Sequence, residues 1–115
     1  MIGAALVAVG LAAGVTATPA SATERINNYE MCINRHDFTE FFRNHSAADK
    51  YCYSAAGPDE PLAVNLDHVT WFHSGVNSGV FEFRDGADGL WKQAEFGPGV
   101  DTGCTDCYVS WIYLY

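Results

Sequence analysis

The chain has 115 residues, with 14 acidic and 6 basic side chains and a formal net charge of −8. Every charged residue, aromatic residue and cysteine lies after residue 22, which excludes one uniform domain and leaves room for a single small domain over residues 23–115. The acidic balance argues against a nucleic-acid partner, because phosphate neutralisation needs clustered Lys and Arg.

Residues 1–22 have the composition of a secretory signal peptide. An apolar run over residues 1–15 is followed by Ala20-Ser21-Ala22, the small-residue pattern of a cleavage site, although the usual positively charged start is missing. A membrane anchor is the alternative, but the run is shorter than the ~20 apolar residues that a spanning helix needs. We therefore expect a secreted, extracellular domain with no membrane span.

Four cysteines in a small secreted domain predict two disulfides rather than a metal site. They allow three connectivities. Cys104 and Cys107 form a C-x-x-C motif without the βαβ context of a redox catalyst, so we favour a local structural disulfide there. The other pair would then be Cys32 with Cys52.

The elements predicted in chain order begin with a short strand over residues 29–34. A helix is predicted next, because Asp37 is a good N-cap and Phe38, Phe41, Phe42 and His45 follow at the spacing of one helix face. After this helix the pattern changes to short strands over residues 51–53, 69–72, 80–84 and 107–115, with turns or loops over 74–79, 85–89, 97–99 and 101–103.

The last of these strands is apolar on both faces, which is typical of a central strand. Several short strands separated by Gly-rich turns predict an all-β sandwich or Greek key that carries one short helix.

Three stretches resemble the small secreted βγ-crystallin-like proteins of actinobacteria, the group that includes the Streptomyces killer-toxin-like protein. The stretches are residues 32–38, residues 51–57, which are similar to a C-[FY]-x-x-A-G step, and residues 64–79. The resemblance implies one βγ-crystallin-like domain of two Greek-key motifs over residues 23–115, with a disulfide between Cys32 and Cys52. The Cys104/Cys107 pair and the acidic loop at residues 58–61 have no match in it.

Calcium is the first candidate ligand, since many βγ-crystallin domains bind it through a motif of the form [ND]-[ND]-x-x-[ST]-S. Asp67 and Thr70 match this motif, whereas Leu66 and Trp71 do not. Because Ca²⁺ takes six to eight oxygen ligands, the two losses favour a plain strand over a calcium site. The four histidines are too dispersed for a compact zinc site, so we expect no cofactor.

The sequence carries no nucleophile-elbow motif or phosphate loop, which favours a non-enzymatic protein. Its aromatic residues stand out instead. Exposed aromatic side chains are enriched in binding sites, so they could mark a site for carbohydrate or protein, or could equally be half-buried sheet residues. The binding candidates are Trp71, Trp91, Trp111 and Tyr113.

These observations predict a secreted, acidic, monomeric module that acts on a protein or cell-wall target. A toxin-like or antimicrobial effector is the function that the resemblance implies. One alternative is a metalloprotease inhibitor with a rigid exposed loop, for which residues 56–61 and 96–104 are the candidates. The other is a calcium-dependent binding or stability module.

Overall fold

The computed structural model describes residues 23–55 and 60–115, so the predicted signal peptide and most of the predicted 56–61 loop lie outside the described residues. Within this part of the chain there are seven strands and one helix. In chain order they are β2 (Glu24–Ile26), α1 (Tyr29–Asn34), β3 (Thr39–Arg43), β4 (Lys50–Ser54), β5 (Leu62–His73), β6 (Gly79–Arg84), β7 (Trp91–Phe96) and β8 (Asp101–Leu114).

The seven strands form one antiparallel sheet in the order β2-β4-β3-β5-β8-β6-β7. The order contains the same unit twice. Strands β3 and β4 form a hairpin and β5 returns beside β3, while β6 and β7 form a hairpin and β8 returns beside β6. The two units meet where β5 pairs with β8, which places the predicted central strand in the centre of the sheet. This repeated return past a hairpin is the Greek-key connection expected from the sequence.

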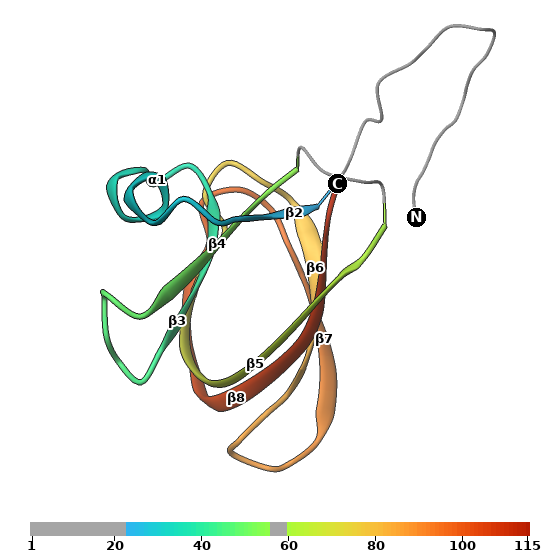
Figure 1. Cartoon of the computed structure of the whole chain (residues 1–115). Coiled ribbons are helices and arrows are strands. Elements are labelled where there is room, and N and C mark those ends of the chain that lie inside the picture. Colours follow the sequence, from blue (N-terminus) through green and yellow to red (C-terminus); the bar gives the residue numbers. More distant parts are fainter. Residues whose placement is uncertain (1–22, 56–59) are drawn as a thin grey trace, which may run out of the picture.

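The long strands β5 and β8 bend so that the two ends of the sheet face each other (Figure 1). Their pairing shifts register at three places, and Asn65, His68 and Asp106 adopt positive φ angles within them. Such bulges bend a strand and increase its twist. As a result Phe41 on β3 contacts Phe81 on β6, with ring centroids 5.1 Å apart, although two strands separate β3 from β6 in the sheet.

Aromatic and aliphatic side chains fill the space between the facing ends. The buried cluster consists of Phe41, Tyr53, Leu66, Val69, Phe72, Phe81, Phe96, Cys107, Val109, Ile112 and Leu114. A smaller cluster near α1 contains Phe38 and the disulfide between Cys32 and Cys52. The second disulfide joins Cys104 to Cys107, so both cysteine pairs are the expected ones.

The predicted first strand and the predicted helix are both wrong, and they are exchanged in the structure. Residues 29–34 form α1, whose N-cap Asn28 accepts a hydrogen bond from the Met31 N–H at 3.0 Å. The residues after Asp37 form β3, because pairing with β4 and β5 on both sides buries Thr39, Glu40 and Phe41. Tertiary context overrides a local helical pattern in this way.

Asp37 does not cap a helix. Its carboxylate pairs with Arg35, and its carbonyl accepts the Val76 N–H at 3.0 Å. The predicted loop at residues 101–103 is also wrong, because these residues form the first part of β8 and pair with β5.

The one helix of the described residues is too short to cross a membrane.

Candidate functional site

Two of the four predicted binding residues are exposed. Trp71 on β5 has 44% of its surface exposed and Trp91 on β7 has 55%, whereas Trp111 and Tyr113 on β8 are half-buried. The four side chains thus come from three strands. Trp71 lines a surface groove that none of the other three reaches.

The groove beside Trp71 has a volume of about 290 Å³ and combines aromatic with hydroxyl groups. Its walls come from β3, from the turn between β3 and β4, and from β5. The lining residues are Phe42, His45, Ser46, Ala47, Thr70 and Trp71.

Backbone pairing sets the shape of this groove. Phe42 lies directly across from Trp71 in the β3–β5 ladder. The turn after β3 begins with Asn44 and His45, which both have positive φ angles. Their backbone N–H groups donate to β5, from Asn44 to the His68 carbonyl at 3.0 Å and from His45 to the Thr70 hydroxyl at 2.9 Å. These bonds hold the turn against β5 as one wall of the groove.

The Trp71 ring is held in a defined position. Its Nε1–H donates to the Asp101 carboxylate at 3.3 Å. A Cβ on Gly103 would lie 3.5 Å from the indole, so the ring packs over the backbone of β8. An aromatic ring that is already oriented loses little conformational entropy when it binds a partner.

A second side chain supports Asp101. His73 Nδ1 lies 2.8 Å from the same carboxylate oxygen, and His73 Nε2 lies 3.0 Å from the His36 carbonyl. Both partners are acceptors, so both ring nitrogens donate only when the imidazole is protonated. Burial opposes this charge, but the bonds to His36 and Asp101 raise the pKa of His73.

The Asp101 carboxylate is correspondingly stabilised in its charged form. Partial burial favours the neutral acid, yet the hydrogen bonds from His73 and Trp71 lower the pKa of Asp101 below its ordinary value. Asp101 therefore stays an anion at neutral pH and remains an acceptor for the indole N–H.

The two calcium candidates already have protein partners. The Asp67 carboxylate accepts a hydrogen bond from Arg43 at 2.8 Å, and the Thr70 hydroxyl accepts the His45 N–H. Within residues 23–55 and 60–115 no three His, Cys, Asp or Glu side chains form a group that could hold a metal ion. Arg43 and His45 thus engage the Asp67 carboxylate and the Thr70 hydroxyl in the structure, and calcium binding at these residues stays a prediction.

The predicted inhibitory loop at residues 96–104 is shorter than its sequence suggests. Only residues 97–100 connect β7 to β8. Val100 is bonded to both the backbone and the hydroxyl of Ser74, and the Gly99 N–H donates to the Gly75 carbonyl at 2.9 Å. These bonds hold the connection in a fixed conformation, and the protease-inhibitor alternative stays a prediction.

Phe42, His45 and Asp101 are among the residues of the site that the sequence analysis did not predict as binding residues. Phe42 and His45 stood in the wrongly predicted helix, and Asp101 stood in a predicted loop. Thr39, Glu40 and Phe41 are buried in succession, so no alternation of buried and exposed residues marks β3. Asp101 meets Trp71 across 30 residues of chain, through the pairing of β5 with β8. No local signal contains that contact.

No protein-family model and no curated protein matches this chain. A search of solved structures finds similarity to the antifungal protein from Streptomyces tendae, with a TM-score of 0.57 and 19% sequence identity, covering 81% of this chain and 99% of that chain. At this identity the likeness establishes the fold alone. The chain is a βγ-crystallin-like double Greek-key sandwich with one short helix.

Proposed function

We propose that this protein is a secreted, non-enzymatic, toxin-like antimicrobial effector that binds a cell-wall target through the Trp71 groove. The observation that carries the proposal is the fold that it shares, over 81% of its length, with an antifungal protein. The groove supplies the surface through which such an effector could recognise its target.

The chemistry of the groove fits a glycan of a cell wall. A flat, exposed indole can stack on the C–H face of a sugar ring, since the face of an aromatic ring carries a partial negative charge. The hydroxyl groups of Ser46 and Thr70 lie beside Trp71 and can exchange hydrogen bonds with sugar hydroxyls. The net charge of −8 disfavours direct attack on an anionic membrane, which attracts basic proteins instead.

Two disulfides support the extracellular part of the proposal. The bonds Cys32–Cys52 and Cys104–Cys107 persist in oxidising compartments and are rare in the cytosol. They also suit a small domain, which buries a smaller share of its surface than a large one.

The test is growth inhibition by the purified, oxidised protein on a filamentous fungus, a yeast and a bacterium. We expect arrest of at least one of these organisms, and we expect Trp71→Ala to abolish it while Trp91→Ala keeps it. Circular dichroism should show that both variants are folded. Lack of any growth effect from the wild-type protein would contradict the effector function, and full activity of Trp71→Ala would contradict the role of the groove.

A further inference from the structure

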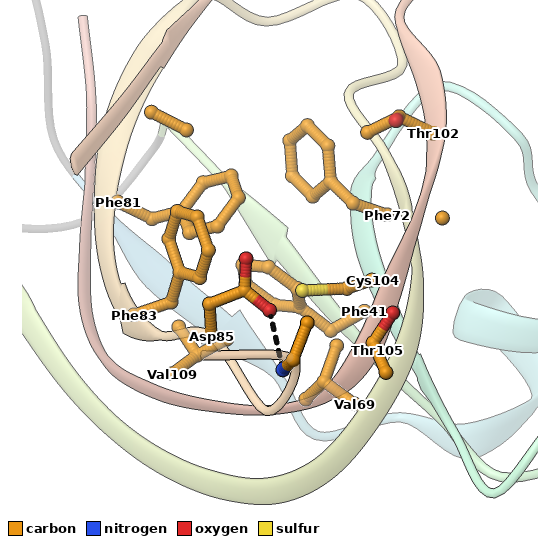
Figure 2. A pocket seen from close by; sticks show the side chains of 13 residues that line it. Phe41, Val69, Phe72, Phe81, Phe83, Asp85, Thr102, Cys104, Thr105 and Val109 are labelled. Carbon is orange, nitrogen blue, oxygen red and sulfur yellow. Dashed lines mark hydrogen bonds between the residues drawn. The ribbon is translucent and has the colours of Figure 1, made fainter. Parts of the chain in front are cut away.

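The interior of the sandwich contains a partly enclosed cavity of about 280 Å³ (Figure 2). Aromatic rings from both facing ends of the sheet point into it, namely those of Phe41, Phe72, Phe81 and Phe83. Two aliphatic side chains, Val69 and Val109, complete the apolar wall.

Exposure increases from the floor of this cavity to its mouth. Phe41 and Val109 are fully buried, and Val69 is 1% exposed. Ala87 and Thr105 line the same cavity and are exposed. The cavity therefore runs from the aromatic core towards solvent, at the end of the sandwich where the β6–β7 turn meets β8.

Small residues leave this space open. Ala87, Ala94 and Gly103 line it, and none of them extends a side chain far enough to fill it. Protein interiors are close-packed, and the atoms around an unfilled apolar void lose their van der Waals contacts. Cavities with apolar walls can take up small apolar molecules, which restore these contacts.

The mouth is rigid and carries one charge that faces the rings. Asp85 accepts the Ala87 N–H at 2.9 Å and pairs with Lys92 at 2.9 Å. Gly86 packs so closely on β8 that a Cβ there would lie 2.1 Å from the Thr105 carbonyl oxygen. Figure 2 shows the Asp85 carboxylate among the phenyl rings, where it would repel a carboxylate or sulfonate ligand.

We propose that this cavity is a binding site for a neutral, compact, apolar molecule of one or two aromatic rings. Its rings would pack against Phe41, Phe72 and Phe81, and any polar end would lie at the mouth beside Asp85. This site is distinct from the Trp71 groove, and its occupancy does not depend on the proposed antimicrobial function.

The test uses the neutral two-ring fluorophore 1-naphthylamine with the full oxidised protein. We expect saturable fluorescence enhancement with one site per chain. The Val69 and Val109 methyl signals should shift in a ¹³C-methyl NMR spectrum, while that of the exposed Val76 should not. Absence of saturable binding, or methyl shifts confined to Val76, would overturn the proposal.

A matched pair of variants locates the bound probe. Ala94→Phe fills the cavity and should weaken binding by about tenfold or more, because the added ring occupies the space of the ligand. Ala63→Phe adds the same ring at an exposed position of β5 outside the cavity and should bind as the wild type does. Equal binding by both variants would assign the probe to the outer surface and contradict the proposal. If Ala94→Phe does not fold, the methyl shifts of the wild-type protein decide the question.

Discussion

Two exposed tryptophans of this protein differ in how the fold holds them. Trp71 and Trp91 have 44% and 55% of their surface exposed, so exposure does not distinguish them. Trp71 donates a hydrogen bond to Asp101 and lines a groove with hydroxyl groups. Trp91 packs edge-on against Tyr108, with ring centroids 6.1 Å apart. Exposure alone thus does not define a binding residue, whereas an oriented ring with polar neighbours does.

The strands next to the two tryptophans are also held differently. Glu40 lies two residues from Phe42 along β3, and its carboxylate pairs with Lys50 of β4 at 2.9 Å. Both side chains are buried, with 2% of Glu40 and 5% of Lys50 exposed. Next to Trp91, Lys92 pairs with Asp85 and Asp88 at the surface. Burial decides how much each interaction contributes to stability.

The largest effect should come from breaking the buried pair. Lys50→Ala leaves the Glu40 charge buried without a partner, so we expect the free energy of unfolding to fall by about 3–5 kcal/mol. Lys92→Ala serves as the matched control and should leave the midpoint of urea unfolding almost unchanged, because water screens exposed ion pairs. Equal losses in the two variants would contradict the distinction between these strands.

The next effect should come from the disulfide beside β3 and β4. Cys32 and Cys52 are 20 residues apart, and replacing both with Ser should lower the free energy of unfolding by about 3 kcal/mol in the chain-entropy model. The Cys104→Ser, Cys107→Ser variant opens a separation of only 3 residues and should lose less. Urea unfolding under non-reducing conditions measures both, and the reverse order would refute this explanation.

The sequence predicted the sandwich from short strands and Gly-rich turns, and the central strand from apolar residues on both of its faces. The C-x-x-C spacing indicated the Cys104–Cys107 pair and thereby left Cys32 with Cys52. The secondary structure predicted from the sequence was wrong over residues 29–45. The spacing of Phe38, Phe41 and Phe42 fits a helix face, and only pairing with β4 and β5 makes this segment a strand.

The candidate site was predictable only in part. Trp71 could be named as an aromatic binding candidate, but nothing local indicated that Phe42 lies across from it or that Asp101 binds its indole N–H. These contacts follow from strand register, and the register of β5 with β8 depends on three bulges. The facing rings around the interior cavity result from the same bend.

A smaller effect should follow from releasing the Trp71 ring. Asp101→Ala removes the acceptor of the indole N–H, and we expect roughly fivefold weaker binding to isolated cell walls, since one hydrogen bond contributes about 1 kcal/mol. Asp101→Asn keeps an acceptor oxygen and should recover most of the binding. A sedimentation assay measures both variants, and equal loss in both would show that Asp101 acts through its charge rather than by positioning Trp71.

The smallest effect concerns the pH dependence of stability. Because the pKa of His73 is raised in the folded state, its contribution is present below about pH 6.5, the ordinary histidine pKa, and is lost as the pH rises through the folded-state value. His73→Gln should remove this part of the slope. Urea unfolding of both proteins across this pH range checks the prediction. His68, whose pKa is raised by Asp106, is unchanged in the variant, so an identical slope in both proteins would assign the effect to other groups.

The most direct test of the account is the binding of the wild-type protein and its two tryptophan variants to isolated fungal cell walls, measured by sedimentation. We predict saturable binding of the wild type, about tenfold or greater weakening by Trp71→Ala, as for a central aromatic residue of an interface, and nearly unchanged binding by Trp91→Ala. Equal binding by the two variants, or loss only with Trp91→Ala, would contradict the assignment of the Trp71 groove as the target-binding surface.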